Sequence, residues 1–333
     1  MTIKVGILGL GMMGKVHFDT YAKLKGARVE AVCDLDAKKR QGDIGHGFGS
    51  IDLSKRKIYT AMEELFADPS LDVIDVCMPT YLHAKCSIAA MKAGKHVICE
   101  KPMARTSAEA REMIAASKKM NRKLFMAQCI RFWPSYVKAR EIVLSGQYGR
   151  VMTARFCRLS GLPNWSWQNW LQDAEKSGRC SLDLHVHDVD FIQYLFGKPK
   201  SVMSRTGGLR KGCMDHIITS YDFGKDQLIT AEGAWEYAWG YPFSMTFSIA
   251  MEGATLDMTH DTKLTLYPIK GKPKDVKVYA GDGYHHELGH FIECIRMNRD
   301  SDVVSPESAM HSVRIIEAEE ESARTGKAVT VRF

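Results

Sequence analysis

The first 34 residues constrain the fold most strongly, because they place a glycine-rich turn between two strand-like segments and a helix. An apolar run over residues 3–9 stops at Gly9-Leu10-Gly11-Met12-Met13-Gly14, and residues 15–25 predict a helix. A second β-rich run, 29–33, ends at Asp34, which is 20 residues after Gly14. Strand, glycine turn, helix, strand and acid in this order are typical of a dinucleotide-binding domain. There the first glycine allows the tight turn, the second leaves room for the pyrophosphate and the third lets helix and strand pack closely.

Asp34 indicates which dinucleotide is bound. A carboxylate at this position accepts hydrogen bonds from both hydroxyls of the adenosine ribose and repels a 2′-phosphate, so NAD is favoured over NADP. The neighbouring Lys38, Lys39 and Arg40 leave a second reading open. These cations are either the solvated first turn of a helix or a set of contacts for the phosphate of NADP.

The pattern of predicted secondary structure changes near residue 130. Strand-like and helical segments alternate up to that point, which predicts a parallel, doubly wound sheet, while the glycine repeat at 42–49 reads as a loop. Beyond a helix at 135–144, alternating strand-like runs predict a mostly antiparallel open sheet in an α+β domain. These runs cover residues 151–159, 200–206, 215–222, 227–235, 243–251, 254–259, 263–267 and 276–279. We therefore expect an α/β protein with a Rossmann domain over 1–130 and a substrate-binding and oligomerisation domain over 131–333.

The segment Glu100-Lys101-Pro102 follows a short β-branched run at 97–99. A lysine at the carboxyl end of a strand lies where open α/β sheets hold their ligands, so Lys101 is placed to meet a substrate. Pro102 restricts its own backbone and that of the preceding lysine. His83, at the start of an earlier helix, is either a hydrogen-bonding residue at the helix start or a catalyst facing the cofactor.

A second group of candidate residues lies in a predicted helix that starts near Ser181, a plausible N-cap. At about 100° per residue, Asp183, His187 and Asp190 fall on one face of such a helix. An imidazole flanked by carboxylates is suited to act as a general base near neutral pH. His185 alternates with His187 and so does not converge with it on one metal ion.

One further motif resembles a zinc site. The run His286-Glu287-Leu288-Gly289-His290 matches H-E-x-x-H, the two-histidine motif of zinc proteases. No pattern for a third ligand follows it, and the glycine weakens the helix that such a site needs. We expect no metal.

Composition narrows the remaining classes. The 333 residues are 45% hydrophobic and include nine scattered cysteines without a C-x-x-C pair, which predicts reduced, buried thiols and a cytoplasmic protein. We find no signal-peptide core and no apolar run of 18 residues, so a membrane partner is not expected. The net charge of +7 is dispersed and accompanied by no nucleic-acid motif. A tryptophan run at 165–170, after Arg155 and Arg158, is either a sugar-stacking wall that includes Trp167 or an aromatic corner of the core.

Taken together, the motifs resemble the Gfo/Idh/MocA oxidoreductase family over nearly the whole chain. The resemblance rests on the glycine turn and on Asp183 with His187 four residues later, together with the segments 79–83, 94–102, 131–134 and 284–326. It implies a catalytic set of Lys101, Asp183 and His187, and a Lys101–Pro102 bond in the cis form. Arg179-Cys180 departs from the glycines that relatives often carry before the aspartate. Expected cofactor contacts are Gly9, Gly11, Met12, Met13, Gly14, Asp34, Pro79, Thr80, His83, Glu100 and Lys101; expected substrate contacts are Lys101, Arg155, Trp167, Asp183, His187 and Asp190.

The activity that this resemblance implies is reversible, NAD-dependent oxidation of a secondary hydroxyl on a sugar, glycoside or cyclic polyol. Three alternatives remain open: internal redox within a glycoside-cleaving or epimerising reaction, reduction of a keto-sugar with NADPH, and non-catalytic NAD sensing. A sheet with one free face commonly finds a partner, so we expect a homodimer or homotetramer.

Overall fold

The computed structural model of the chain describes residues 2–208, 214–259 and 263–333. These residues form two compact units. The first comprises Met1–Cys129, Trp165–Trp170 and Gly283–Met310, and the second comprises Ile130–Asn164, Leu171–Asp282 and His311–Phe333. The expected boundary at residue 130 lies where the chain first passes from the first unit to the second. Two later segments, Trp165–Trp170 and Gly283–Met310, belong to the first unit again.

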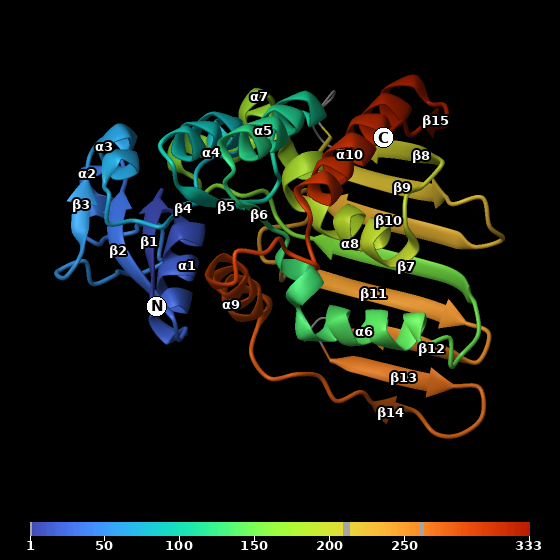
Figure 1. Cartoon of the computed structure of the whole chain (residues 1–333). Coiled ribbons are helices and arrows are strands. Elements are labelled where there is room, and N and C mark those ends of the chain that lie inside the picture. Colours follow the sequence, from blue (N-terminus) through green and yellow to red (C-terminus); the bar gives the residue numbers. More distant parts are fainter. Residues whose placement is uncertain (1, 209–213, 260–262) are drawn as a thin grey trace. The chain divides into compact units, whose positions relative to one another are not determined.

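The first unit contains a six-stranded, all-parallel sheet, coloured blue to teal in Figure 1. Its strand order, β3-β2-β1-β4-β5-β6, is that of dinucleotide-binding domains. The strands are β1 (Ile3–Leu8), β2 (Ala27–Cys33), β3 (Lys57–Tyr59), β4 (Val73–Val76), β5 (His96–Glu100) and β6 (Leu124–Ala127). The helices are α1 (Met12–Lys23), α2 (Ala37–Arg40), α3 (Met62–Ala67), α4 (His83–Lys92), α5 (Ser107–Met120) and α9 (Gly283–Arg296).

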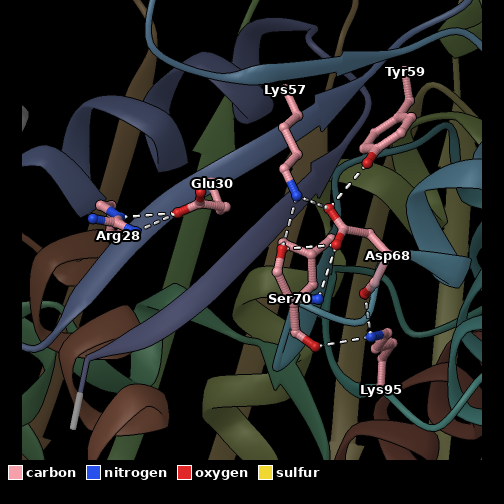
Figure 2. Close-up of polar contacts among 8 residues, drawn as sticks. Arg28, Glu30, Lys57, Tyr59, Asp68, Ser70 and Lys95 are labelled. Carbon is pink, nitrogen blue, oxygen red and sulfur yellow. Dashed lines mark hydrogen bonds and ion pairs between the residues drawn. The ribbon is translucent and has the colours of Figure 1, made fainter.

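The short edge strand β3 is held by one buried carboxylate, which Figure 2 shows at the centre of its polar contacts. Asp68 Oδ2 accepts hydrogen bonds from Lys57 Nζ and Tyr59 Oη, each at 3.0 Å. Asp68 Oδ1 accepts from the backbone N–H and the hydroxyl of Ser70 at 2.8 and 2.7 Å. The buried Lys95 ammonium donates to the backbone carbonyls of Asp68 and Leu71. No strand is predicted at 57–59 from the sequence, because a three-residue run has no clear periodicity.

The second unit contains a nine-stranded sheet in the order β14-β13-β12-β11-β7-β10-β9-β8-β15. Only β7 and β10 pair in parallel, so the sheet is mostly antiparallel, as expected. Its strands are β7 (Val151–Leu159), β8 (Ser201–Gly207), β9 (His216–Asp222), β10 (Leu228–Ala234), β11 (Ser244–Met251), β12 (Ala254–Met258), β13 (Leu264–Pro268), β14 (Lys274–Asp275) and β15 (Val329–Thr330). The strand predicted at 276–279 is wrong: pairing with β13 occurs at 274–275, and the chain then leaves the sheet edge.

Helices cover one face of this sheet (Figure 1). They are α6 (Pro134–Leu144), α8 (Val186–Phe196) and the part of α10 (Pro306–Thr325) that belongs to this unit. Aromatic rings join α6 and α8 to the sheet: Tyr136 lies 4.8 Å from Phe191 and 5.0 Å from Phe247, and Phe156 packs on the same two rings. Burying these large side chains supplies much of the hydrophobic stabilisation of this layer.

The described cysteines agree with the predicted reduced state. All eight are free thiols; seven are buried and Cys77 is half-buried, while Cys213 lies outside the described residues. Within the described part of the chain, no helix combines the length and apolar character needed to cross a membrane.

Candidate active site

The glycine turn has the geometry that its spacing predicts. Gly9 has a φ of +95°, and a Cβ there would lie 2.6 Å from the Cys77 carbonyl oxygen. A Cβ on Gly14 would lie only 2.0 Å from the Gly9 carbonyl oxygen, so both positions exclude a side chain. A Cβ on Gly11, in contrast, would have no protein atom within 4 Å. The middle glycine therefore faces open space, as a position approached by a ligand does.

Two further observations support a fit to NAD. Helix α1 begins after Gly11, which makes no side-chain cap, so the first N–H groups of the helix can meet a pyrophosphate. Thr80 begins the short 3₁₀ turn η1 (Thr80–Leu82), and its Oγ1 is buried without a hydrogen-bond partner in the described part of the chain. A buried hydroxyl of this kind is satisfied when a polar ligand binds beside it.

Asp34 lies just beyond β2 and is held by the backbone around it. Its Oδ2 accepts from the Leu10 N–H at 2.7 Å and its Oδ1 from the Asp36 N–H at 2.8 Å. Lys39 Nζ is 3.9 Å from the same carboxylate, and Arg40 donates to the Asp34 carbonyl oxygen at 2.7 Å. These cations therefore contact Asp34 and its backbone.

Lys101 follows β5 directly, as expected. Its peptide bond to Pro102 is cis, and its backbone N–H donates to Glu100 Oε2 at 3.0 Å. On the other side, His83 Nδ1 lies 2.8 Å from the Pro102 carbonyl oxygen and its Nε2 2.7 Å from that of Met78. Burial lowers the pKa of this imidazole below 6.5. Both ring nitrogens thus contact the backbone, which favours the structural reading of His83 over the catalytic one.

The second candidate group is not on one regular helix. Cys180–Leu184 forms a π-helical turn, η4, and α8 begins only at Val186, so Ser181 is not an N-cap. Its hydroxyl instead donates to the Gly178 carbonyl oxygen and to Glu320. In a π-turn the angle between successive residues differs from the 100° of an α-helix, so the arrangement expected for one α-helical face does not apply across this segment. Between residues 180 and 192, only Asp183 and His187 are not buried.

Asp190 has a different environment from these two. It is 1% exposed, and its carboxylate accepts from Arg131 Nε and Nη2 at 2.7 and 2.8 Å and from Ser312 Oγ at 2.7 Å. A carboxylate engaged in this way holds the core together. Asp190 therefore forms a buried ion pair with Arg131, and its contact with substrate stays a prediction. Arg131 was noted only as part of a family segment.

Arg155 and Arg158 point to opposite faces of β7. Arg158 points to the helical layer, where it binds the carboxylate of Asp188 on α8 at 2.9 and 3.0 Å. Because successive side chains alternate along a strand, Arg155 points to the opposite face of β7, away from the helix that carries His187. There it pairs with Glu232 of β10 at 2.9 Å. This placement does not support a contact of Arg155 with the same substrate as His187, which stays a prediction.

The tryptophan run belongs to the first unit. Trp165 packs edge-on against Phe48 at 5.5 Å, in agreement with an aromatic corner of that unit. Trp167 is half-buried in η3 (Trp167–Gln172), and its contact with substrate stays a prediction.

Arg179, which departs from the family pattern, takes the backbone conformation of a glycine. Its φ is +57°, a region that L-residues rarely adopt. Its guanidinium is buried, pairs with both carboxylate oxygens of Asp215 and donates to the Gln172 carbonyl oxygen. This ion pair offsets the backbone strain immediately before the turn that carries Asp183.

A cavity of about 440 Å³ lies at the opposite edge of the first sheet, at the amino ends of its strands. Its charged lining residues are Asp72, Arg122, Glu293 and Arg296. Two acids balance two arginines, so the charge of the lining favours neither an anionic nor a cationic ligand. The glycine turn lies at the other end of the strands, their carboxyl end, where dinucleotides bind.

Family models match both parts of the chain. Residues 3–128 match the model described as an oxidoreductase family with an NAD-binding Rossmann fold. Residues 136–257 match the GFO/IDH/MocA C-terminal domain. NAD is thus the cofactor that the first unit is built to hold.

Similar proteins act on sugars and polyols where their names state an activity. The chain is 25% identical over 306 residues to myo-inositol 2-dehydrogenase of Thermotoga maritima, covering 88% of each chain. It is 24% identical over 344 residues to the uncharacterized oxidoreductase YrbE of Bacillus subtilis, covering 99% of this chain and 96% of the relative. The structure of levoglucosan dehydrogenase in complex with NADH and levoglucosan superposes with a TM-score of 0.86 at 23% identity, covering all of both chains. This structural likeness establishes the fold.

Proposed function

Since the chain belongs to the GFO/IDH/MocA oxidoreductase family, we propose that it is an NAD-dependent dehydrogenase that reversibly oxidises a secondary hydroxyl of a sugar, glycoside or cyclic polyol to a ketone. The observation that carries this proposal is the retention of Lys101, Asp183 and His187 in a chain that matches both domains of the family. The inositol dehydrogenase among its relatives supports the substrate class.

In the proposed reaction, the substrate loses a proton from its hydroxyl oxygen and a hydride from the carbon that bears it. When bound, NAD supplies the acceptor for that hydride at its nicotinamide ring. His187 removes the hydroxyl proton as a general base. Lys101 donates a hydrogen bond to the oxygen as negative charge develops on it, and its positive charge favours neutral His187. Asp183 orients the lysine and the substrate.

Exposure of the side chains supports these roles. Asp183 and His187 are half-buried in a segment whose other residues are buried, so both can reach a ligand. Lys101 is half-buried at the carboxyl end of β5, the edge of a doubly wound sheet where ligands bind. The backbone around Lys101 is held in place: its N–H donates to Glu100, and the carbonyl oxygen of the following Pro102 contacts His83.

The test is reduction of NAD and NADP by the purified protein across a panel of inositols, free sugars and glycosides. We expect NADH to form with one class of substrate. The Lys101→Met variant should lose turnover by about 10²- to 10⁴-fold, because it removes the donor to the developing oxyanion. Lys92→Met, on the exposed face of α4, is the matched control and should leave turnover unchanged.

Other outcomes identify other functions. A Lys101→Met protein that keeps more than half of its activity contradicts the assignment of Lys101. Turnover without added cofactor, with NAD that co-purifies, indicates internal redox, and a preference for NADPH indicates a reductase. NAD binding without turnover indicates a sensor. We extend the proposal to a cytoplasmic homodimer or homotetramer, which size-exclusion chromatography with light scattering tests.

A further inference from the structure

A buried polar cluster lies beneath α1 in the first unit, outside the residues of the proposed reaction. His17 is fully buried on this helix. Its Nδ1 lies 2.8 Å from Asp75 Oδ2 on β4, and its Nε2 lies 3.0 Å from Glu100 Oε1 at the end of β5. One imidazole therefore contacts carboxyl groups from two adjacent strands of the sheet.

These contacts determine the protonation of the ring. Nδ1 makes a hydrogen bond with Asp75, whereas Nε2 lies within ion-pair distance of Glu100 without a hydrogen-bond partner in the described part of the chain. Burial by itself lowers the pKa of His17, but the Asp75 carboxyl group and the Cys77 thiol outweigh it, and the pKa lies well above 6.5. The charged form of His17 is therefore favoured relative to that of an ordinary histidine.

Other titratable groups face the same cluster. Tyr21, one turn further along α1, donates to Asp75 Oδ2 at 2.9 Å. Cys77 Sγ lies 3.5 Å from His17 Nδ1, and burial raises the pKa of its thiol to about 12. Tyr284 and Glu287 of α9 interact electrostatically with this cluster, Tyr284 with His17 and Glu287 with Tyr21. Several acidic groups therefore surround the His17 imidazole and favour its charged form. Because the raised pKa keeps the Cys77 thiol protonated, Cys77 is no nucleophile.

Glu100 connects this cluster to the lysine of the proposed reaction. Its second oxygen, Oε2, accepts the backbone N–H of Lys101 at 3.0 Å. Glu100 itself is 5% exposed, so its carboxylate needs a positive partner within the core. His17 is that partner, and it lies on the helix that starts at the glycine turn.

We propose that His17 is a positioning residue: its buried imidazole contacts and fixes the Glu100 carboxyl group, which in turn holds the backbone of Lys101 in the orientation required for hydroxyl oxidation. The role in oxidation rests on the function proposed above. The helix that meets the cofactor pyrophosphate and the turn that carries the lysine are then linked through one side chain. A shift of that turn by about 1 Å is enough to lower turnover by about 10²-fold.

Two substitutions of His17 separate this role from a general structural one. Glutamine places an amide nitrogen about where Nε2 lies, so it keeps a polar contact with Glu100 while removing the charge. Asparagine places its amide nitrogen about where Nδ1 lies and keeps only the donor to Asp75. We expect His17→Asn to lower kcat by about 10- to 100-fold with little change in the KM for NAD, and His17→Gln to recover most of that loss. In a Lys101→Met background, His17→Asn should lower the residual rate no further.

Equal losses in the two His17 variants, or a full additional loss in the Lys101→Met background, would overturn the proposal. An assay without turnover keeps the test independent of the substrate. Hydrogen exchange of the Lys101 amide, in the holoenzyme with NAD, should be faster in His17→Asn and near wild type in His17→Gln. If the wild type oxidises no polyol but shows this exchange pattern, the proposed reaction fails while the linkage from His17 to Lys101 stands.

A measurement on the wild-type protein covers the case in which both variants fail to fold. Nitrogen-15 NMR of the imidazole distinguishes the doubly protonated ring from either neutral tautomer. We expect the His17 resonances to report an imidazolium at a pH above the usual histidine pKa of about 6.5. A neutral ring at that pH would overturn the proposal.

Discussion

At the scale of single residues, two aspartates seven positions apart have opposite environments. Asp183 is half-buried in a π-turn, whereas Asp190 is buried and holds Arg131. The sequence places both among acids near a histidine and gives no sign of this difference. The partner of Asp190 lies 59 residues earlier in the chain, so only the fold brings the two together.

This contrast predicts opposite effects of the same substitution. Asp190→Asn should lower the free energy of unfolding by about 3–5 kcal/mol, because it leaves the Arg131 guanidinium buried without its counter-ion. Asp183→Asn should change stability little and lower turnover by about 10²-fold or more. Urea denaturation and NAD reduction measure the two effects. A stable Asp190→Asn protein with a raised KM for the polyol would support the expectation of substrate contact.

His17 predicts a dependence of stability on pH. Because its pKa is raised in the folded protein, the folded state binds the proton more tightly than the unfolded state does. The stabilisation that the charge supplies is complete below pH 6.5 and is lost as the pH rises through the raised pKa. Wild type should exceed His17→Gln in free energy of unfolding by about 1–3 kcal/mol near pH 6, and by less near pH 9. A difference that grows with pH contradicts this sign.

At the scale of elements, short segments are held by polar contacts rather than by their own propensity. The three residues of β3 pair with β2, and the Asp68 carboxylate anchors two of their side chains (Figure 2). The π-turn that carries Asp183 follows a strained Arg179, whose side chain is fixed by Asp215. In both cases, a buried carboxylate outside the element, Asp68 or Asp215, holds a segment that local sequence does not predict.

Substitutions at two acids test this view of β3. Asp68→Ala should lower the free energy of unfolding by about 1–3 kcal/mol, because it removes the acceptor of several part-buried hydrogen bonds at once. Glu30→Ala removes the partly exposed Arg28–Glu30 pair that Figure 2 shows beside β3, and should cost about 0.5 kcal/mol or less. Urea unfolding curves measure both. Equal effects would mean that the Asp68 contacts contribute no more than a surface pair.

Acid should reproduce the effect of Asp68→Ala. Despite its burial, hydrogen bonds from Ser70, Lys57 and Tyr59 lower the pKa of Asp68 well below its usual value. The stabilisation from this carboxylate is therefore present above pH 4 or so and is lost as the pH falls toward the lowered pKa. The difference between wild type and Asp68→Ala should shrink in acid.

At the scale of the whole molecule, the two units are built around different sheets, one parallel and one mixed. Three strands of the parallel sheet, β1, β2 and β5, are followed directly by the glycine turn, Asp34 and Lys101, and all of these belong to the first unit. The mixed sheet belongs to the second unit, with Asp183 and His187 beside its helical layer. We therefore expect NAD binding to change the first unit more than the second.

Ligand-induced stabilisation tests this division. NAD at about 100 times its Kd should stabilise the folded protein by about 2.7 kcal/mol, and NADP at equal concentration should stabilise it less, because Asp34 repels a 2′-phosphate. Hydrogen exchange should show NAD-dependent protection at residues 9–14 and 78–83 of the first unit. Asp34→Ser is expected to narrow the difference between the two cofactors. Equal stabilisation of the wild type by both would favour the phosphate-binding reading of Lys38, Lys39 and Arg40.

Patterns that repeat along the chain were sufficient to predict the architecture. Alternation of apolar strands with helices predicts the parallel sheet, and two-residue alternation predicts the antiparallel one, since both periods follow from backbone geometry. The glycine spacing likewise predicted a turn in which Gly9 and Gly14 exclude a side chain and Gly11 faces open space. These features depend on residues within about one supersecondary unit of each other.

Tertiary structure alone decided which polar residues are buried and what they bind. His17 meets Asp75 and Glu100, Arg131 meets Asp190, and these partners lie between 58 and 83 positions apart. A charged residue within an apolar strand, such as Asp75 between Ile74 and Val76, signals that a buried partner exists but does not identify it. The identity of that partner depends on which strands become neighbours, because a buried charge is stabilised by contacts through space and not by its position along the chain.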